Sequence, residues 1–239
     1  MTWLWRICFS GLWLLPLWCA TVKGTVELTD SRDPGVRRHK DFRGVVVWLE
    51  PAAGRAALPA GSPRRVQTMK QKNKHFDPHV LAIPVGGAVD FPNLDPIFHN
   101  VFSNFSGQTF DLSLYKPNTS RRVVFTRAGI VRVFCNIHPT MSGVIAVLDT
   151  PWFAVSDASG AFEIRDLPQG SYTLHVFHER ATDETLNALL RPVTVEGTAP
   201  RVLEGIKISE TGYIPAPHKN KWDKDYPPAI DDTPAYRPN

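Results

Sequence analysis

The sequence predicts an all-β protein with two β domains. Three observations support this: the 239 residues include 21 prolines and 16 glycines, short apolar runs recur with turn residues between them, and residues 24–150 show no helical period. So many prolines disfavour a helical bundle. Hydrophobic residues make up 43% and charged residues 21% of the chain, which argues against global disorder and against a protein with many membrane spans. The formal net charge of +4 is too small to indicate nucleic acid.

Residues 1–20 are expected to be a secretory signal peptide outside the fold. Their apolar run, 7–20, follows a single positive residue and is too short to span a bilayer comfortably. Ala20 suits the last residue removed, whereas the bulky Trp18 is unusual at a cleavage site, so an uncleaved N-terminal anchor is the alternative. Cleavage would leave a periplasmic protein without a membrane span, and Cys135 would be its only cysteine.

The segment 24–150 is expected to form the first β domain. Its strand-like runs lie at 24–28, 44–49, 79–91 with a corner at Gly86 and Gly87, 121–125, 130–134 and 143–148. Short strands at this spacing are typical of a sandwich or barrel. A basic stretch covers 32–74, and residues 52–74 within it look like an insertion. This stretch either docks an acidic partner or is simply solvated.

A second, smaller β domain is expected over 151–210. Tyr172, Leu174 and Val176 alternate with polar residues, which is typical of an antiparallel sheet with one buried face. The other expected elements are a strand and turn at 153–160, strands at 161–164, 192–195 and 202–208, and a helical turn or loop at 183–190. From 211 to 239 the chain is rich in Pro, Lys, Asp and Tyr without a period, so this tail is expected to be mobile or draped over the surface.

The residues with the most informative spacing are Cys135, His138 and Met141, which form the pattern Cys-x2-His-x2-Met between two expected strands. A second histidine, His99, leaves an earlier strand in another loop. One thiolate, two imidazoles and a weak axial thioether are the ligands of a blue-copper site. The soft thiolate holds both copper oxidation states, and the neutral thioether favours Cu(I). We therefore expect one type 1 copper.

Other interpretations of these four residues are less well supported. A structural zinc site usually has several cysteines, and a dicopper centre needs a second cysteine in the loop. A cysteine nucleophile would need a base and a third group rather than a methionine at fixed spacing. Four unrelated core residues are the remaining alternative. Against it, the chain after the signal has only Met69 and Met141, and Met141 lies six residues after the only cysteine.

The run from Phe76 to Leu148 resembles a cupredoxin. The matching motifs are Phe76-x-Pro78, Val85 to Asn93, Phe98 to Val101 and Gly129 to Cys135, in the family's order. The resemblance implies a Greek-key β-sandwich. It also implies that Asn100, next to the first histidine, makes a hydrogen bond that ties the two ligand loops together. The ligand loop, with His138 before Pro139, is most similar to amicyanin, and the chain after the signal resembles periplasmic cupredoxin-like proteins labelled as methylamine-utilisation proteins.

The second domain resembles the carboxypeptidase-regulatory or transthyretin-like sandwich. The matching residues are Asp157, Gly160 and Phe162, followed by Leu167, Pro168, Gly170 and Tyr172. Such modules usually lack catalytic residues. His175 and His178 are three apart on an expected strand and face opposite ways, which disfavours a joint metal site.

These observations predict a periplasmic electron carrier rather than an enzyme. By resemblance, His138 beside Pro139 would form the electron's exit through an apolar patch, and Phe98 would widen this patch. The expected partner is a redox protein such as a c-type cytochrome or a periplasmic dehydrogenase. One alternative is a periplasmic copper carrier or assembly factor with the same ligands, and another is a structural protein with a vestigial site. No catalytic triad, phosphate loop or pair of acids has an informative spacing.

Overall fold

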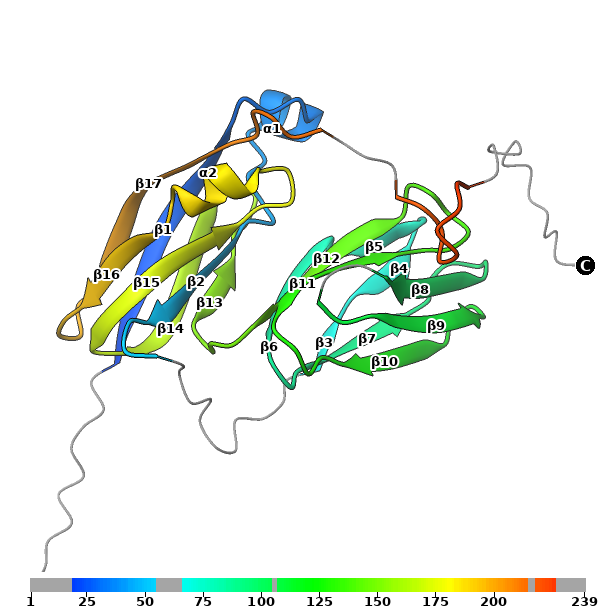
Figure 1. Ribbon diagram of the computed structural model, residues 1–239, viewed down its shortest axis with the longest axis horizontal. Coiled ribbons are helices and arrows are strands. Elements are labelled where there is room, and N and C mark those ends of the chain that lie inside the picture. The colour runs from blue at the N-terminus through cyan, green and yellow to red at the C-terminus, as the bar shows by residue number, and fades with distance from the viewer. Residues whose placement is uncertain (1–18, 55–65, 105–106, 215–217, 227–239) are drawn as a thin grey trace, which may run out of the picture.

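The molecule consists of two β units (Figure 1). The central unit is one continuous stretch of chain, and the composite unit combines strands that precede and follow it. The fold is nearly all β, as predicted. The computed structural model describes residues 19–54, 66–104, 107–214 and 218–226.

The central unit is a sandwich of two sheets. Its strands are β3 (Val66–Thr68), β4 (Lys70–Lys72), β5 (His75–Asp77), β6 (Val80–Pro84), β7 (Ala88–Pro92), β8 (His99–Ser103), β9 (Phe110–Tyr115), β10 (Ser120–Val124), β11 (Gly129–Phe134) and β12 (Ser142–Leu148). One sheet has the order β6-β12-β11-β8-β9 and the other β10-β7-β3, while β4 pairs with β5. Phe91 of one sheet and Val131 and Ile145 of the other share a single buried core, to which Cys135 and Met141 also belong. The core therefore extends directly to the candidate ligands.

Local sequence explains several of these strands. The expected corner at Gly86 and Gly87 separates β6 from β7, and Gly86 has a φ of 83°, which glycine adopts without strain. The expected strands at 121–125, 130–134 and 143–148 are found as β10, β11 and β12 within one residue. By contrast, His99 was expected in a loop and is the first residue of β8. The next strand, β9, was not expected, although Phe110, Leu112 and Leu114 alternate with Asp111 and Ser113 in the sequence.

The composite unit is a second pair of sheets. Its elements are β1 (Cys19–Thr29), α1 (Pro34–His39), β2 (Val46–Pro51), β13 (Phe153–Val155), β14 (Ala161–Pro168), β15 (Gly170–Phe177), α2 (Asp183–Asn187), β16 (Arg191–Val195) and β17 (Arg201–Ser209). The sheet orders are β14-β1-β17 and β13-β2-β15-β16. Tyr172, Leu174 and Val176 are all buried, as their alternation predicts. The short helix α1 begins where the Asp33 side chain accepts hydrogen bonds from the first helical N–H groups.

The domain boundary expected at residue 24 is wrong for the first two strands. Residues 24–28 and 44–49 were assigned to the first domain, but β1 lies between β14 and β17, and β2 lies between β13 and β15. Apolar alternation shows that a strand has a buried face, but it does not show which sheet supplies its neighbours. The central unit is thus inserted into the composite unit between β2 and β13.

The expected insertion at 52–74 is too long. Residues 55–65 lie outside the described residues, but β3 and β4 are regular parts of the central unit, with β3 pairing to β7 and β4 to β5. Met69 and Gln71 are fully buried and alternate with the exposed Lys70 and Lys72. The outward lysines are common on edge strands, and they made this region resemble a solvated insertion.

The two chain ends concern the expected signal peptide and the expected C-terminal tail. Most of the predicted signal, 1–18, lies outside the described residues, while Cys19 and Ala20 begin β1, where Ala20 is buried. In the tail, residues 218–226 are described and contact the central unit. Among the described residues, no helix has the length and apolar character needed to cross a membrane.

An apolar cluster joins the two units. Val80, Val144 and Ala146 of β6 and β12 pack with Val46 of β2, and Phe153 of β13 packs against the same cluster. One face of the β6-β12 pair therefore covers the central core, and the other face is covered by the composite unit. A polar contact adds to this junction, because His79 Nε2 lies 2.8 Å from a carboxylate oxygen of Glu179.

Candidate metal centre

The candidate ligands come from the ends of adjacent strands in one sheet. Cys135 follows the last residue of β11, and His138 and Met141 lie in the loop that leads to β12. We call residues 135–141 the ligand loop. It is closed by two backbone hydrogen bonds, one from Cys135 N to the Met141 carbonyl at 3.1 Å and one from Met141 N to the His138 carbonyl at 3.0 Å. His99 begins β8, which pairs with β11.

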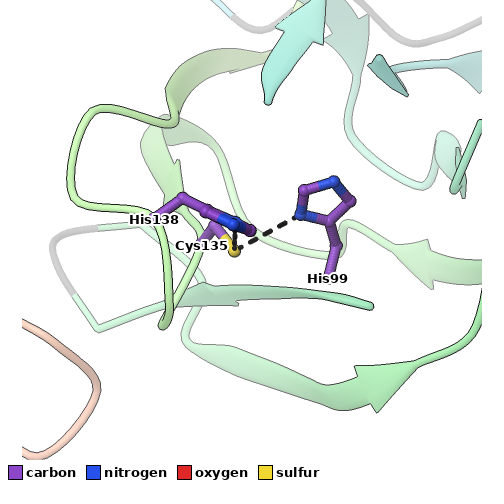
Figure 2. A group of neighbouring side chains, drawn as sticks. All are labelled: His99, Cys135 and His138. Carbon is purple, nitrogen blue, oxygen red and sulfur yellow. Dashed lines mark hydrogen bonds between the residues drawn. The ribbon is translucent and has the colours of Figure 1, made fainter. Parts of the chain in front are cut away.

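Three of the predicted ligands converge on one point (Figure 2). The Cys135 sulfur lies 3.8 Å from His99 Nδ1 and 3.5 Å from His138 Nδ1, and all three donor atoms lie within 4.8 Å of one another. His99 and Cys135 are fully buried, and His138 is half-buried. Among the described residues, no other group of three such side chains has its donor atoms so close.

The orientation of His99 depends on a buried carboxylate, Asp95. His99 Nε2 lies 2.7 Å from Asp95 Oδ2, and the backbone N–H groups of Asn73 and Lys74 also donate to the Asp95 carboxylate. Burial lowers the pKa of His99, which outweighs the opposite effect of Asp95. Burial also tends to raise the pKa of Asp95, but its hydrogen bonds lower it overall. A neutral imidazole that donates Nε2–H to a carboxylate has its Nδ1 lone pair directed toward the Cys135 sulfur, as a metal ligand requires.

The surroundings of Cys135 suit a metal-bound thiolate. Burial raises the pKa of its thiol, and backbone N–H groups of Asn100, Ile137 and His138 lower it in part. These donors would stabilise a negative sulfur, but they do not compensate fully for its burial. A bound cation would supply the missing compensation and replace the thiol proton. A thiolate, two imidazole nitrogens and a nearby methionine form a donor set that fits copper.

The other predicted site residues are placed as follows. Met141 is fully buried in the same core as Cys135, while Phe98 and Pro139 are exposed beside the two histidines. Asn100 does connect to the site, but through its backbone N–H; its side chain instead donates to Asp111 of β9 at 2.7 Å. In the composite unit, His175 stacks on Trp48 and His178 pairs with Glu210, so they do not share a ligand.

Sequence reasoning missed Asp95. It lies four residues before His99, in a segment that was read only as a loop leaving a strand. The signal that could have found it is chemical: a buried histidine ligand needs an acceptor for its second ring nitrogen, and Asp95 is the nearest acidic residue in the sequence.

The fold and the convergence of a cysteine with two histidines define a cupredoxin-like protein. The chain is 37% identical over 99 residues to the methylamine utilization protein MauL of Methylorubrum extorquens, a match that covers 41% of this chain and 85% of MauL. The chain therefore belongs to the family of MauL. No family model matches it.

Two solved structures are similar to part of the chain. The purple cupredoxin from Nitrosopumilus maritimus is 24% identical with a TM-score of 0.32, over 34% of this chain and 99% of that protein. The Cu(I) form of an amicyanin mutant is 20% identical with a TM-score of 0.34, over 40% of this chain and all of that protein (100%).

Proposed function

We propose that this protein is a periplasmic type 1 copper protein that carries single electrons between redox partners. The observation that carries the proposal is the convergence of the Cys135 sulfur with His99 Nδ1 and His138 Nδ1 in a buried site. These three residues would hold the copper, with Met141 as the weak axial ligand. When bound, one copper supplies a one-electron couple.

The protein residues prepare the site for that couple. Asp95 holds the neutral tautomer of His99, and three backbone N–H groups face the sulfur of Cys135. The hydrogen bonds across the ligand loop and the packed core around Met141 limit how far the ligands can move between oxidation states. Small movement lowers the reorganisation that accompanies electron transfer.

The proposed electron exit is the half-buried His138. Its sequence neighbours Ile137 (43%) and Pro139 are exposed, and Phe98, the residue before His99, exposes 45% of its surface. Such an apolar face suits docking of a redox protein such as a c-type cytochrome or a dehydrogenase. Because His99, Cys135 and Met141 are fully buried, a substrate could reach the site only past His138, which favours a carrier over an enzyme.

The test is to add Cu(II) to the protein that begins at Cys19 and to record its visible absorption and EPR spectra. An intense thiolate-to-copper band with narrow hyperfine splitting is expected. Cys135→Ser should abolish the band, whereas Met141→Leu should keep it and shift the reduction potential. A colourless or tetragonal copper site in the unaltered protein would refute the electron-carrier proposal. Fast loss of copper to a chelator with poor redox cycling would indicate copper carriage instead.

A further inference from the structure

A C-terminal segment, residues 218–226, lies against the ligand loop beside one end of the central unit (Figure 1). We call it the C-terminal strap. It folds as a compact turn around the buried Asn220. The side-chain oxygen of Asn220 accepts hydrogen bonds from the backbone N–H groups of Trp222 and Lys224, and Asn220 N donates to the Lys224 carbonyl. The strap therefore has a defined shape of its own.

The strap contacts the peptide of the predicted thiolate ligand. The Tyr226 hydroxyl donates to the backbone carbonyl of Cys135 at 2.7 Å. His218 stacks on Phe134, the residue before Cys135, with the ring centroids 4.2 Å apart. His218 Nδ1 also lies 3.2 Å from the Tyr226 hydroxyl, so the two strap side chains hold each other in place.

Lys221 links the strap to both segments that bear ligands. Its backbone N–H donates to the side chain of Asn136 in the ligand loop at 3.0 Å. Its ammonium group lies 2.7 Å from Asp111 Oδ2, and the other oxygen of Asp111 accepts the 2.7 Å hydrogen bond from Asn100, the neighbour of His99. One short segment is thus connected to the surroundings of both Cys135 and His99.

We propose that the C-terminal strap is a positioning element of the metal centre, and that Tyr226 is its main positioning residue. The hydroxyl of Tyr226 fixes the Cys135 peptide through a hydrogen bond, and Lys221 binds Asn136 and Asp111. The inference concerns the same site as the proposed function and rests on it for the effect on copper. The positive end of the Tyr226 O–H dipole points toward the ligand peptide, where it favours the more electron-rich reduced site.

The first test uses the metal-free full chain and needs no copper chemistry. Tyr226→Phe removes only the hydroxyl, and the loosened ligand loop should expose Cys135 to alkylation about fivefold faster, as expected for the loss of one net hydrogen bond. Mass spectrometry of the Cys135 peptide separates this thiol from Cys8 and Cys19. Tyr172→Phe is the matched control, because the Tyr172 hydroxyl also donates to a backbone carbonyl at 2.7 Å, that of Pro168 in the composite unit.

The second test compares the same variants loaded with copper. Tyr226→Phe should lower the reduction potential and shift the thiolate-to-copper band, whereas Tyr172→Phe should leave both at the wild-type values. His218→Phe keeps a ring on Phe134 but removes the contact with Tyr226, and it should shift the band in the same direction. Equal alkylation rates in wild type, Tyr226→Phe and His218→Phe would overturn the positioning role. An unaltered protein without the copper band would instead refute the proposed function, and the alkylation result would still decide the role of the strap.

Discussion

Replacing Asp95 by Asn is expected to weaken copper binding by about 10- to 100-fold, or about 1.4 to 2.8 kcal/mol. The two carboxylate oxygens accept three hydrogen bonds: Oδ2 from His99 and from the Lys74 N–H, and Oδ1 from the Asn73 N–H. Asn has one oxygen and one amide nitrogen at these places. In either orientation its NH2 group faces at least one donor, so at least one buried donor loses its acceptor.

The size of the effect follows from that count. Leaving a buried donor without an acceptor costs about 1–3 kcal/mol. Asp95 is 6% exposed and His99 is fully buried, so water does not replace the lost partner easily. One part of the cost should fall on the fold and appear as a lower free energy of unfolding of the metal-free protein. The other part should fall on copper affinity, because His99 loses the carboxylate that fixes its tautomer.

The assay is a competition titration of Cu(II) against a calibrated chelator at pH 7, with urea unfolding of the metal-free protein beside it. Asp90→Asn is the matched control. Asp90 makes a two-point ion pair with Arg122, with distances of 2.6 and 2.8 Å, on the exposed surface of β7 and β10. Such a pair contributes about 0–1 kcal/mol to stability and should not affect copper. If folded Asp95→Asn binds copper as tightly as wild type, the carboxylate does not orient His99.

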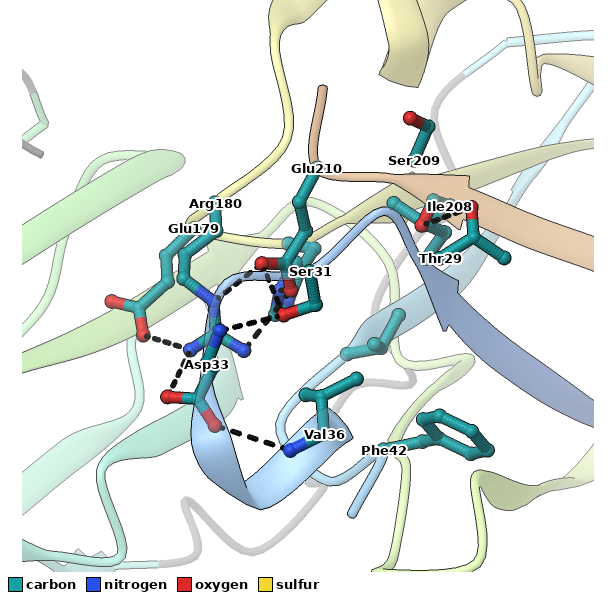
Figure 3. A network of polar contacts seen from close by, with 12 residues as sticks. Thr29, Ser31, Asp33, Val36, Phe42, Glu179, Arg180, Ile208, Ser209 and Glu210 are labelled. Atoms are coloured by element: carbon teal, nitrogen blue, oxygen red, sulfur yellow. Dashed lines mark hydrogen bonds and ion pairs between the residues drawn. The ribbon is translucent and has the colours of Figure 1, made fainter. Parts of the chain in front are cut away.

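Two further predictions concern the composite unit. The first concerns Glu210, which Figure 3 shows with Ser31 and Arg180. Burial alone would raise the pKa of Glu210. Hydrogen bonds from His178, Arg180 and Ser31 outweigh this effect and lower the pKa from 4.5 to about 2. Because the pKa is lower in the folded state, the stabilisation is present above pH 4.5 and is lost as the pH falls toward 2. Urea unfolding at a series of pH values should show the free energy of unfolding falling by about 3 kcal/mol over this range. A Glu210→Gln variant with the same acid sensitivity as wild type would contradict this. Gly160 has a φ of 83°, and a Cβ there would lie 2.1 Å from the Val26 carbonyl oxygen, so Gly160→Ala should lower the free energy of unfolding by at least about 2 kcal/mol. Gly197→Ala, with a φ of 64° and open space around it, should cost only about 1 kcal/mol, and equal losses in the two variants would show that the contact with Val26 is not decisive.

The sequence predicts most of the candidate metal centre because its proposed ligands follow local rules. Cys135 and His138 share one short loop, and a loop between paired strands keeps such residues together. His99 comes from another part of the chain. It was predicted as a second histidine next to an earlier strand, and its neighbours Phe98 and Asn100 agree with the resemblance to cupredoxins. Asp95 was missed although it lies only four residues before His99, because its segment was interpreted as a loop and the need of a buried histidine for an acceptor was not considered.

Other features depend on contacts that no local pattern encodes. The alternation in β1 and β2 is correct for strands, but their partners β14, β15 and β17 lie far along the chain. The tail was expected to be mobile or draped over the surface because it is polar and has no period. Residues 218–226 lie against the central unit, which agrees with the second alternative. Their contact with the ligand loop was not expected, because the hydrogen-bond partners of Tyr226 and Lys221 are 91 and 85 residues away in sequence.

The way the central unit is attached bears on the proposed electron transfer. β2 and β13, which lead into and out of it, pair directly with each other, so both attachments start from one rigid sheet. The outer face of β6 and β12 then packs on that sheet through Val46, Val144 and Ala146. Since β12 begins directly after Met141, the composite unit holds one side of the ligand loop through β12, and the C-terminal strap holds the loop through Cys135 and Asn136. A loop held in both ways would change little between the oxidation states of a bound copper, which is the mechanical property that the proposed one-electron carrier needs.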